Sequence, residues 1–124
     1  MIEYTINLMK LHRWKSIPLE QLSAALARQA IHTDRITIAR LELKQGAMVP
    51  DHHHENEQVT ILMAGKLQFI TADEDLTIEA GEVMQIPSNV VHRVIALEDS
   101  WVFDLFAPVR EDWLRGDDAY LRRG

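Results

Sequence analysis

Short apolar segments separated by polar turns constrain the fold of this chain most strongly. Between Arg35 and Phe106, β-branched and apolar residues alternate with Gly, Asp, Glu and Pro clusters about every 8–12 residues. This pattern is typical of a small all-β sandwich or barrel of about eight strands. The Ala64-Gly65-Lys66 sequence predicts a hairpin between two of them. The expected strands cover residues 35–43, 58–63, 66–69, 76–79, 83–86, 90–97 and 101–106.

The two ends of the chain predict short helical segments. Leu19, Leu22 and Leu26 recur at a helical spacing, and Pro18 suits a first helical position. We therefore expect one or two helical turns from about Pro18, and a weakly helical tail from Arg110 onward. One domain accounts for the whole chain, with an N-terminal segment at 1–34, a barrel core at 35–107 and a tail at 108–124.

Composition narrows the class of protein. The 124 residues and 14.3 kDa suit one domain. A net charge of −6 argues against nucleic acid as a partner, since that partner needs a basic face. The absence of Cys excludes disulfides, thiol catalysis and iron–sulfur clusters, so any metal must have N and O ligands. No apolar run predicts a membrane span, and Met1 to Tyr4 do not resemble a signal peptide, so we expect a cytoplasmic protein.

The run Asp51-His52-His53-His54-Glu55 is the most unusual feature of the sequence. On an extended segment, residues 52, 54 and 58 project to one side, whereas 53, 55 and 57 project to the other. His52, His54 and Gln58 would then converge, and His92 in a later strand is a candidate fourth ligand. Two alternatives stay open at this point: the run is a solvated loop, and His92 is a core histidine bonded to a backbone carbonyl.

The spacing of these residues resembles the two motifs of the cupin family. The first comprises Gly46, His52-x-His54, Gln58 and Gly65, and the second comprises Gly81, Pro87 and His92. The resemblance implies a small RmlC-like cupin barrel, or jelly roll, with His52, His54, Gln58 and His92 as metal ligands. The sequence departs from the motif in three places: Gln58 replaces the usual Glu, Asn89 replaces a Gly, and Ala96 replaces the closing Asn.

Gln58 changes the charge of the expected metal site. Three neutral imidazoles and an amide leave the full charge on one divalent ion, which favours an anionic ligand. A small anionic sugar or carboxylate is therefore the expected partner. The ligand set suits Zn, Ni, Fe, Mn and Co alike. The missing carboxylate argues against an iron-dependent dioxygenase, because such enzymes use a His/His/carboxylate triad.

Asp104 is a charged residue in an otherwise apolar strand, Trp101 to Phe106. It shares a face with Phe106, so it is expected to be buried, and a buried carboxylate needs a partner. Arg110 is the nearest candidate in the sequence, which favours a structural ion pair. Beside a metal in the barrel, Asp104 is instead expected to act as a general acid and base.

The segment Asp104 to Leu114, together with the histidine pattern, is similar to the small KdgF-type cupins of pectin degradation. The resemblance implies linearisation of 4,5-unsaturated uronates to keto-deoxyuronates, with Asp104, Phe106 and Arg110 needed for activity. It also implies a homodimer, for which Trp14 and the early strand are candidate contacts, and a partly extended stretch from Ala25 to His32. The rival interpretation is a non-catalytic, metal-dependent module that binds a small carboxylate.

Overall fold

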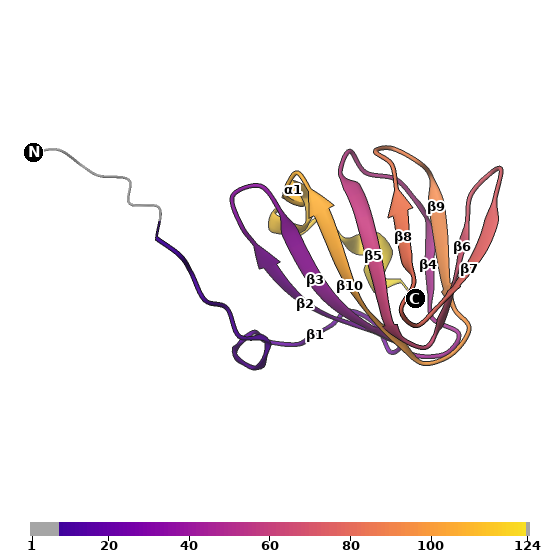
Figure 1. Cartoon of the computed structure of the whole chain (residues 1–124), viewed down its shortest axis with the longest axis horizontal. Helices are drawn as coiled ribbons and strands as arrows, with labels where there is room; N and C mark the ends of the chain where they lie inside the picture. The colour runs from indigo at the N-terminus through magenta and orange to yellow at the C-terminus, as the bar shows by residue number, and fades with distance from the viewer. Residues whose placement is uncertain (1–7, 124) are drawn as a thin grey trace, which may run out of the picture.

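A computed structural model describes residues 8–123, and the fold consists of two antiparallel sheets that face each other (Figure 1). The six-stranded sheet has the order β1-β2-β3-β10-β5-β8, and the four-stranded sheet has the order β4-β9-β6-β7. The strands are β1 (Glu20–Gln21), β2 (Leu26–His32), β3 (Thr37–Leu43), β4 (Met48–His52), β5 (Glu57–Ala64), β6 (Lys66–Ile70), β7 (Asp75–Glu79), β8 (Val83–Ile86), β9 (His92–Ala96) and β10 (Ser100–Ala107). No helix in this described range is long and apolar enough to cross a bilayer. Met1 to Tyr4, where the sequence predicts no signal peptide, lie outside the described residues.

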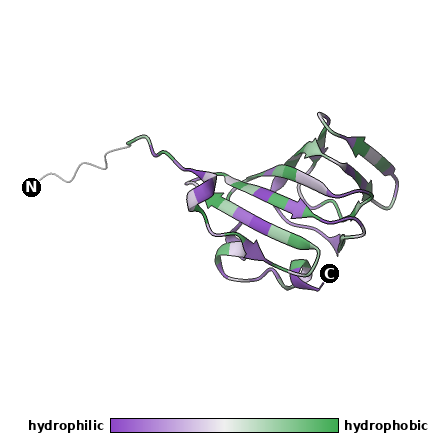
Figure 2. Cartoon of the chain, turned by 90° about the horizontal axis from the view of Figure 1, so that it is seen from below, coloured by the Kyte–Doolittle hydropathy of each residue, from purple (hydrophilic) through white to green (hydrophobic). Residues whose placement is uncertain are grey.

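Alternation along the strands places the core between the sheets. In β3 and β10 every second residue is buried, and Figure 2 shows hydrophobic and hydrophilic positions in bands along the strands. The most deeply buried apolar side chains come from both sheets: Ala39, Leu62, Leu67, Ala96, Val102 and Phe106. The prediction of a small all-β fold is confirmed, and the seven segments expected as strands all contain one. Two strands were not predicted, the short β1 and β4.

The helix predicted from Pro18 is wrong. The chain instead forms a short 3-10 helix, η1 (Trp14–Ser16), and then β1. Leu22 and Leu26 are both buried in the core. They flank a turn that is closed by a hydrogen bond from Leu22 N to Leu26 O at 2.9 Å. β2 then pairs along its whole length with β3, so tertiary pairing overrides the local helical spacing. The extended stretch implied for Ala25 to His32 is confirmed by β2.

The hairpin predicted at Gly65 is also wrong. β5 pairs with β10 and β8, whereas β6 pairs with β7 and β9. Gly65 is therefore the point where the chain passes from one sheet to the other. Its φ of +100° lies in the left-handed region, and an added Cβ would collide with Ser100 and the carbonyl oxygen of Asp99. The local signal for a sharp turn was sound, but it did not specify which strands the turn joins.

The C-terminal tail packs against one end of the sandwich. It contains the single-turn helix α1 (Glu111–Leu114) and the 3-10 helix η2 (Ala119–Arg122), which lies against β4. Trp113 and Leu121 are buried in the core. Asp118 accepts hydrogen bonds from Arg28 of β2 at 2.8 Å and from Arg122 at 2.9 Å. The weakly helical tail is confirmed, and its side chains become part of the pocket described next.

Candidate metal site

Three histidines converge between the sheets. His52 ends β4 and lies directly opposite His92, the first residue of β9, in the pairing of these strands. His54 directly precedes the bend at residues 55–56 that leads to β5. The nearest ring nitrogens of the three histidines all lie within 4.8 Å of one another. The structure thus brings together residues that are nearly forty positions apart in the chain.

Backbone carbonyls orient all three imidazoles. The Nδ1 atoms lie 2.7 Å from Pro50 O for His52, 2.9 Å from Asn56 O for His54 and 2.8 Å from Val90 O for His92. With the Nδ1 protons donated to these carbonyls, the Nε2 lone pairs are left free to bind a metal. Nε2 of His92 is buried and has no hydrogen-bond partner among residues 8–123. This geometry fits a shared cation, because an orphaned buried acceptor is otherwise costly.

Burial keeps the histidines neutral. Desolvation, followed by the neighbouring His92, lowers the pKa of His52 to about 3. Desolvation, followed by the charge of Arg110, lowers the pKa of His54 to about 4. The pKa of His92 is also lowered, mainly by desolvation. Neutral imidazoles are the form that binds a divalent metal, so near neutral pH the site needs no proton removed.

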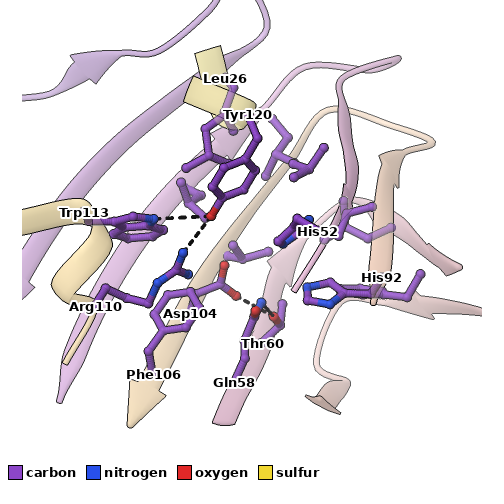
Figure 3. Close-up of a pocket in the computed structure, with 18 residues that line it drawn as sticks. Leu26, His52, Gln58, Thr60, His92, Asp104, Phe106, Arg110, Trp113 and Tyr120 are labelled. Atoms are coloured by element: carbon purple, nitrogen blue, oxygen red, sulfur yellow. Dashed lines mark hydrogen bonds between the residues drawn. The ribbon is translucent and has the colours of Figure 1, made fainter. Parts of the chain in front are cut away.

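Gln58 connects the histidines to a buried carboxylate. Its Oε1 lies 3.0 Å from Nε2 of His54, so two acceptors face each other when Nδ1 of that ring holds the proton. Its amide nitrogen donates to the Thr60 hydroxyl at 3.0 Å, and that hydroxyl donates to Asp104 Oδ1 (Figure 3). The facing acceptors favour a cation between them. The donor set of three imidazoles and one amide oxygen suits a divalent transition metal.

Asp104 lies inside the sandwich and is 6% exposed. It is directly opposite Thr60 in the pairing of β10 with β5, just as Phe106 is opposite Gln58. Burial raises the pKa of Asp104 to about 6, although hydrogen bonds from Thr60 and Gln58 and the charge of Arg110 act against this rise. The carboxyl can therefore hold or release a proton close to neutral pH. It lines the same pocket as His52, His92 and Arg110.

Arg110 brings a buried positive charge to the other side of the pocket. It donates to Asp112 at 2.9 and 2.7 Å and to the Tyr120 hydroxyl at 2.7 Å. Its guanidinium lies over the rings of Phe106 and Trp113, at 4.6 and 4.3 Å from their centroids. Burial by itself lowers the pKa of Arg110, but its interactions with Asp112 and Tyr120 have the larger effect, so the pKa is raised overall. The pocket thus holds a fixed cation opposite the histidines.

Comparison with known proteins identifies the family. The family profile described as Cupin domain matches residues 39–106, which include all three converging histidines, His52, His54 and His92. The chain belongs to the cupin family. No curated protein matches the sequence of this cupin.

Several solved structures resemble it along most of the chain. KdgF from Halomonas sp. superposes with a TM-score of 0.74 at 25% identity, covering 80% of this chain and 94% of its own. An RmlC-like cupin from Shewanella frigidimarina NCIMB 400 has a TM-score of 0.78 at 20% identity, covering 86% and 96%. The polyketide cyclase RemF from Streptomyces resistomycificus has a TM-score of 0.67 at 17% identity, covering 82% and 80%. This cupin thus has a fold similar to that of KdgF from Halomonas sp..

The departures from the cupin motif have structural explanations. Asn89, at the glycine position, has a φ of +63°, a left-handed conformation that Asn tolerates better than most residues. Its backbone N–H donates to His54 O at 2.8 Å, so this turn holds the histidine loop. Ala96, at the usual Asn position, is 1% exposed and packs in the core. Neither substitution disturbs the convergence of the histidines.

The prediction that residues 53, 55 and 57 project away from the site is confirmed. His53, Glu55 and Glu57 are exposed, opposite to the pocket. The segment is not one continuous strand, however, because it bends at residues 55–56 between the two sheets. The other two histidines lie away from this cupin's pocket. His12 is exposed, whereas His32 is half-buried and bonded to the Thr37 hydroxyl at 2.8 Å.

The structural ion pair considered between Asp104 and Arg110 is not formed. Arg110 pairs with Asp112, and Asp104 is bonded to Thr60 instead. The sequence reasoning missed Thr60, Tyr120 and Asp112 as parts of the site. Thr60 was open to detection, because it lies two residues after Gln58 and shares its face. Nothing in the sequence of the tail indicated that Tyr120 would meet Arg110 and His52.

Proposed function

We propose that this cupin is a metal-dependent enzyme that opens the ring of 4,5-unsaturated uronate monosaccharides to give keto-deoxyuronates. The observation that carries the proposal is the hydrogen-bonded connection from Gln58 through Thr60 to Asp104, inside a largely apolar pocket. It couples a buried acid to the residues that would hold the metal. The likeness to KdgF from Halomonas sp. supports the same activity.

His52, His54, His92 and Gln58 are the proposed ligands of one divalent ion per chain. When bound, this ion would supply a Lewis acid that holds the substrate carboxylate and stabilises negative charge on a neighbouring oxygen. The neutral ligand set leaves the positive charge of the site uncompensated, which favours an anionic sugar acid. Arg110 adds a second cation on the opposite wall for the same carboxylate or for a second oxygen.

Asp104 is the proposed acid and base. It takes the proton of the anomeric hydroxyl, the bond between C1 and the ring oxygen breaks, and an aldehyde forms at C1. The electron pair stays on the former ring oxygen as an enolate conjugated with the C4–C5 double bond. Asp104 then returns the proton to C4, so the C5 oxygen becomes a ketone carbonyl. Atoms and charge balance, and no other reactant is needed.

The remaining residues position these groups. Thr60 donates its hydroxyl proton to Asp104 and accepts one from Gln58, which fixes the carboxylate relative to the metal ligands. Phe106 contacts His54 edge-on, at 5.6 Å between centroids, and lies under Arg110. We propose that its ring packs on the sugar and keeps water from the enolate. We also propose that the protein works in the cytoplasm on this small substrate.

The test follows the loss of the conjugated double bond. Metal-loaded protein is incubated with 4,5-unsaturated galacturonate, and ultraviolet absorbance records the rate. Wild type should accelerate the loss, and a chelator should suppress it. Asp104→Asn keeps the shape but cannot transfer the proton, so the rate should fall roughly a hundredfold or more. Asp73→Asn, the same change at an exposed turn, should leave the rate unchanged.

Two outcomes would change the interpretation. Metal-loaded wild type that binds the uronate without accelerating its conversion would be a binding module, the rival that the sequence left open. Equal rates in wild type and Asp104→Asn would keep the enzyme but move the acid and base elsewhere.

A further inference from the structure

The pocket is smaller than the ligand it is proposed to bind. Its volume is about 50 Å³. Pockets that take drug-sized ligands enclose roughly 300–1,000 Å³, and one water occupies about 30 Å³ of liquid. A sugar acid therefore cannot be enclosed between the sheets unless part of the wall moves. The polar groups on that wall are His52, Gln58, Thr60, His92, Asp104, Arg110 and Tyr120.

Tyr120 is the polar wall group that comes from the last part of the C-terminal tail, beyond Gly116. Its ring stacks on His52, with 4.8 Å between centroids and 25° between planes (Figure 3). Its hydroxyl accepts hydrogen bonds from Arg110 at 2.7 Å and from Trp113 at 3.4 Å. Tyr120 thus covers His52, a proposed metal ligand. It also accepts a hydrogen bond from the Arg110 guanidinium, the group that would otherwise bind a ligand carboxylate.

The tail is the part of the wall best suited to move. The other polar wall groups, Arg110 apart, lie on strands held by sheet ladders. Backbone hydrogen bonds of the tail stay local, from Asp117 N to Asp112 O and from Leu121 N to Asp118 O. Side chains hold it to the barrel, chiefly Asp118 on Arg28 and the buried Leu121. Gly116, with a φ of +82°, precedes the segment.

We propose that Tyr120 is the gate of the pocket and selects anionic ligands. In the closed state its hydroxyl accepts a hydrogen bond from Arg110. A ligand carboxylate is the stronger acceptor for this guanidinium, because it carries a full negative charge and can accept two parallel N–H bonds from it. The carboxylate replaces the hydroxyl on Arg110, Tyr120 leaves His52, and the pocket opens. A neutral sugar offers no such exchange and leaves the gate closed.

The first test measures access to the pocket in metal-free protein, so it does not depend on the proposed function. Diethylpyrocarbonate modifies accessible neutral histidines, and mass spectrometry gives the rate at each position. His92 is the reporter because it is 1% exposed and its Nε2 is covered. His12 and His53 are exposed and serve as internal controls. Asp117→Asn is the matched control variant, since within residues 8–123 this exposed carboxylate pairs with exposed Arg115 alone.

Removing the gate should speed modification of His92. Tyr120→Ala should raise its rate about tenfold or more, because a hydrogen bond to a charged donor is lost together with the ring. Tyr120→Phe keeps the ring and should give an intermediate rate. Asp117→Asn should match wild type, and His12 and His53 should react equally in every protein. Equal His92 rates in wild type and both Tyr120 variants would overturn the gate.

Arg122→Gln provides a second route if Tyr120→Ala does not fold. It removes one of the two arginines on Asp118 from an exposed position, so the tail should open more often and His92 should react faster. An unchanged rate in this folded variant and in Tyr120→Phe would count against the gate.

The second test concerns selection and does rest on the proposed function. Hydrogen exchange of residues 117–122 is measured in metal-loaded wild type, with galacturonate and with neutral galactose. Galacturonate should speed exchange in this segment, and galactose should not. If both sugars or neither speed it, the selection by charge is wrong, whereas the access test still decides the gate. If the uronate assay shows no activity but the Tyr120 variants still speed modification of His92, the proposed function is rejected and the gate stands.

Discussion

At the scale of single residues, the Gln58 amide offers both an acceptor and a donor, and an ionised carboxylate offers only acceptors. Its amide oxygen faces His54, where it is a candidate metal ligand, while its amide nitrogen donates to Thr60. A glutamate has only acceptors when ionised, so it would lose the bond to Thr60 and place a second negative charge near Asp104. The substitution of Glu by Gln in the motif therefore affects the acid as well as the charge of the metal site.

Gln58→Glu should tighten metal binding and weaken binding of an anionic ligand, because it removes one positive charge from the site. Metal analysis should find about one divalent ion per chain in wild type, since the site has one set of converging ligands. Titration calorimetry with metal, and then with galacturonate, measures both affinities. Gln45→Glu makes the same charge change on an exposed turn and should alter neither. Unchanged affinities in Gln58→Glu would place this residue outside the metal's ligands.

At the scale of elements, strand pairing brings the site together. β5 and β10 place Thr60 opposite Asp104 and Gln58 opposite Phe106, and β4 and β9 place His52 opposite His92. A shift of either pairing by one residue would turn these side chains to the outer face. The crossing at Gly65 matters for the same reason, since it sends β5 and β6 into different sheets at a fixed register.

Gly65→Ala should lower the free energy of unfolding by about 2 kcal/mol or more, because a non-Gly residue at positive φ costs roughly 1–3 kcal/mol and the new Cβ would also collide with Ser100. Gly46→Ala is the matched control. Its φ is +87°, but an added Cβ would meet nothing within 4 Å, so only the conformational cost applies. Urea unfolding of both variants separates the two effects. Equal losses would mean that the structure accommodates the methyl group at Gly65.

At the scale of the whole molecule, the segment of residues 8–13 extends away from the barrel (Figure 1). Leu8, Met9 and Leu11 are exposed on it. Where it reaches the barrel, Trp14 packs against Phe103 with tilted rings, 5.7 Å between centroids, on the outer face of the six-stranded sheet. Exposed apolar residues that continue into a half-exposed aromatic surface are typical of a contact between protein chains. We propose that a second copy of this chain covers them.

The purified protein should therefore sediment as a homodimer, with twice the mass of the 14.3 kDa chain. Leu11→Lys should shift it towards monomer, because a charge would be buried in the contact. Leu76→Lys places the same change on β7 in the other sheet and should leave the dimer intact. A wild-type protein that sediments as a monomer at high concentration would contradict the homodimer.

The local pattern of the sequence was sufficient to predict most of the strands and several residues of the candidate site. Alternation of apolar and polar residues predicted the strands and the buried face of Asp104 and Phe106, because side chains on a strand alternate whatever the partner strand is. Motif spacing predicted that His52, His54 and His92 would meet. Even where the segment bends at residues 55–56, the exposed positions were predicted correctly.

Long-range packing decided the rest. Backbone hydrogen bonds follow the same pattern in any antiparallel pair of strands, so the turn at Gly65 did not reveal that β5 and β6 belong to different sheets. The helical spacing near Pro18 gave way to the pairing of β2 with β3, which satisfies a whole strand of backbone groups. The partners of Arg110 depended on where the tail packs, and buried Leu121 and the ion pair of Asp118 with Arg28 hold Tyr120 over His52. Contacts between residues so far apart in the chain leave no periodicity in the sequence, and only the folded structure brings them together.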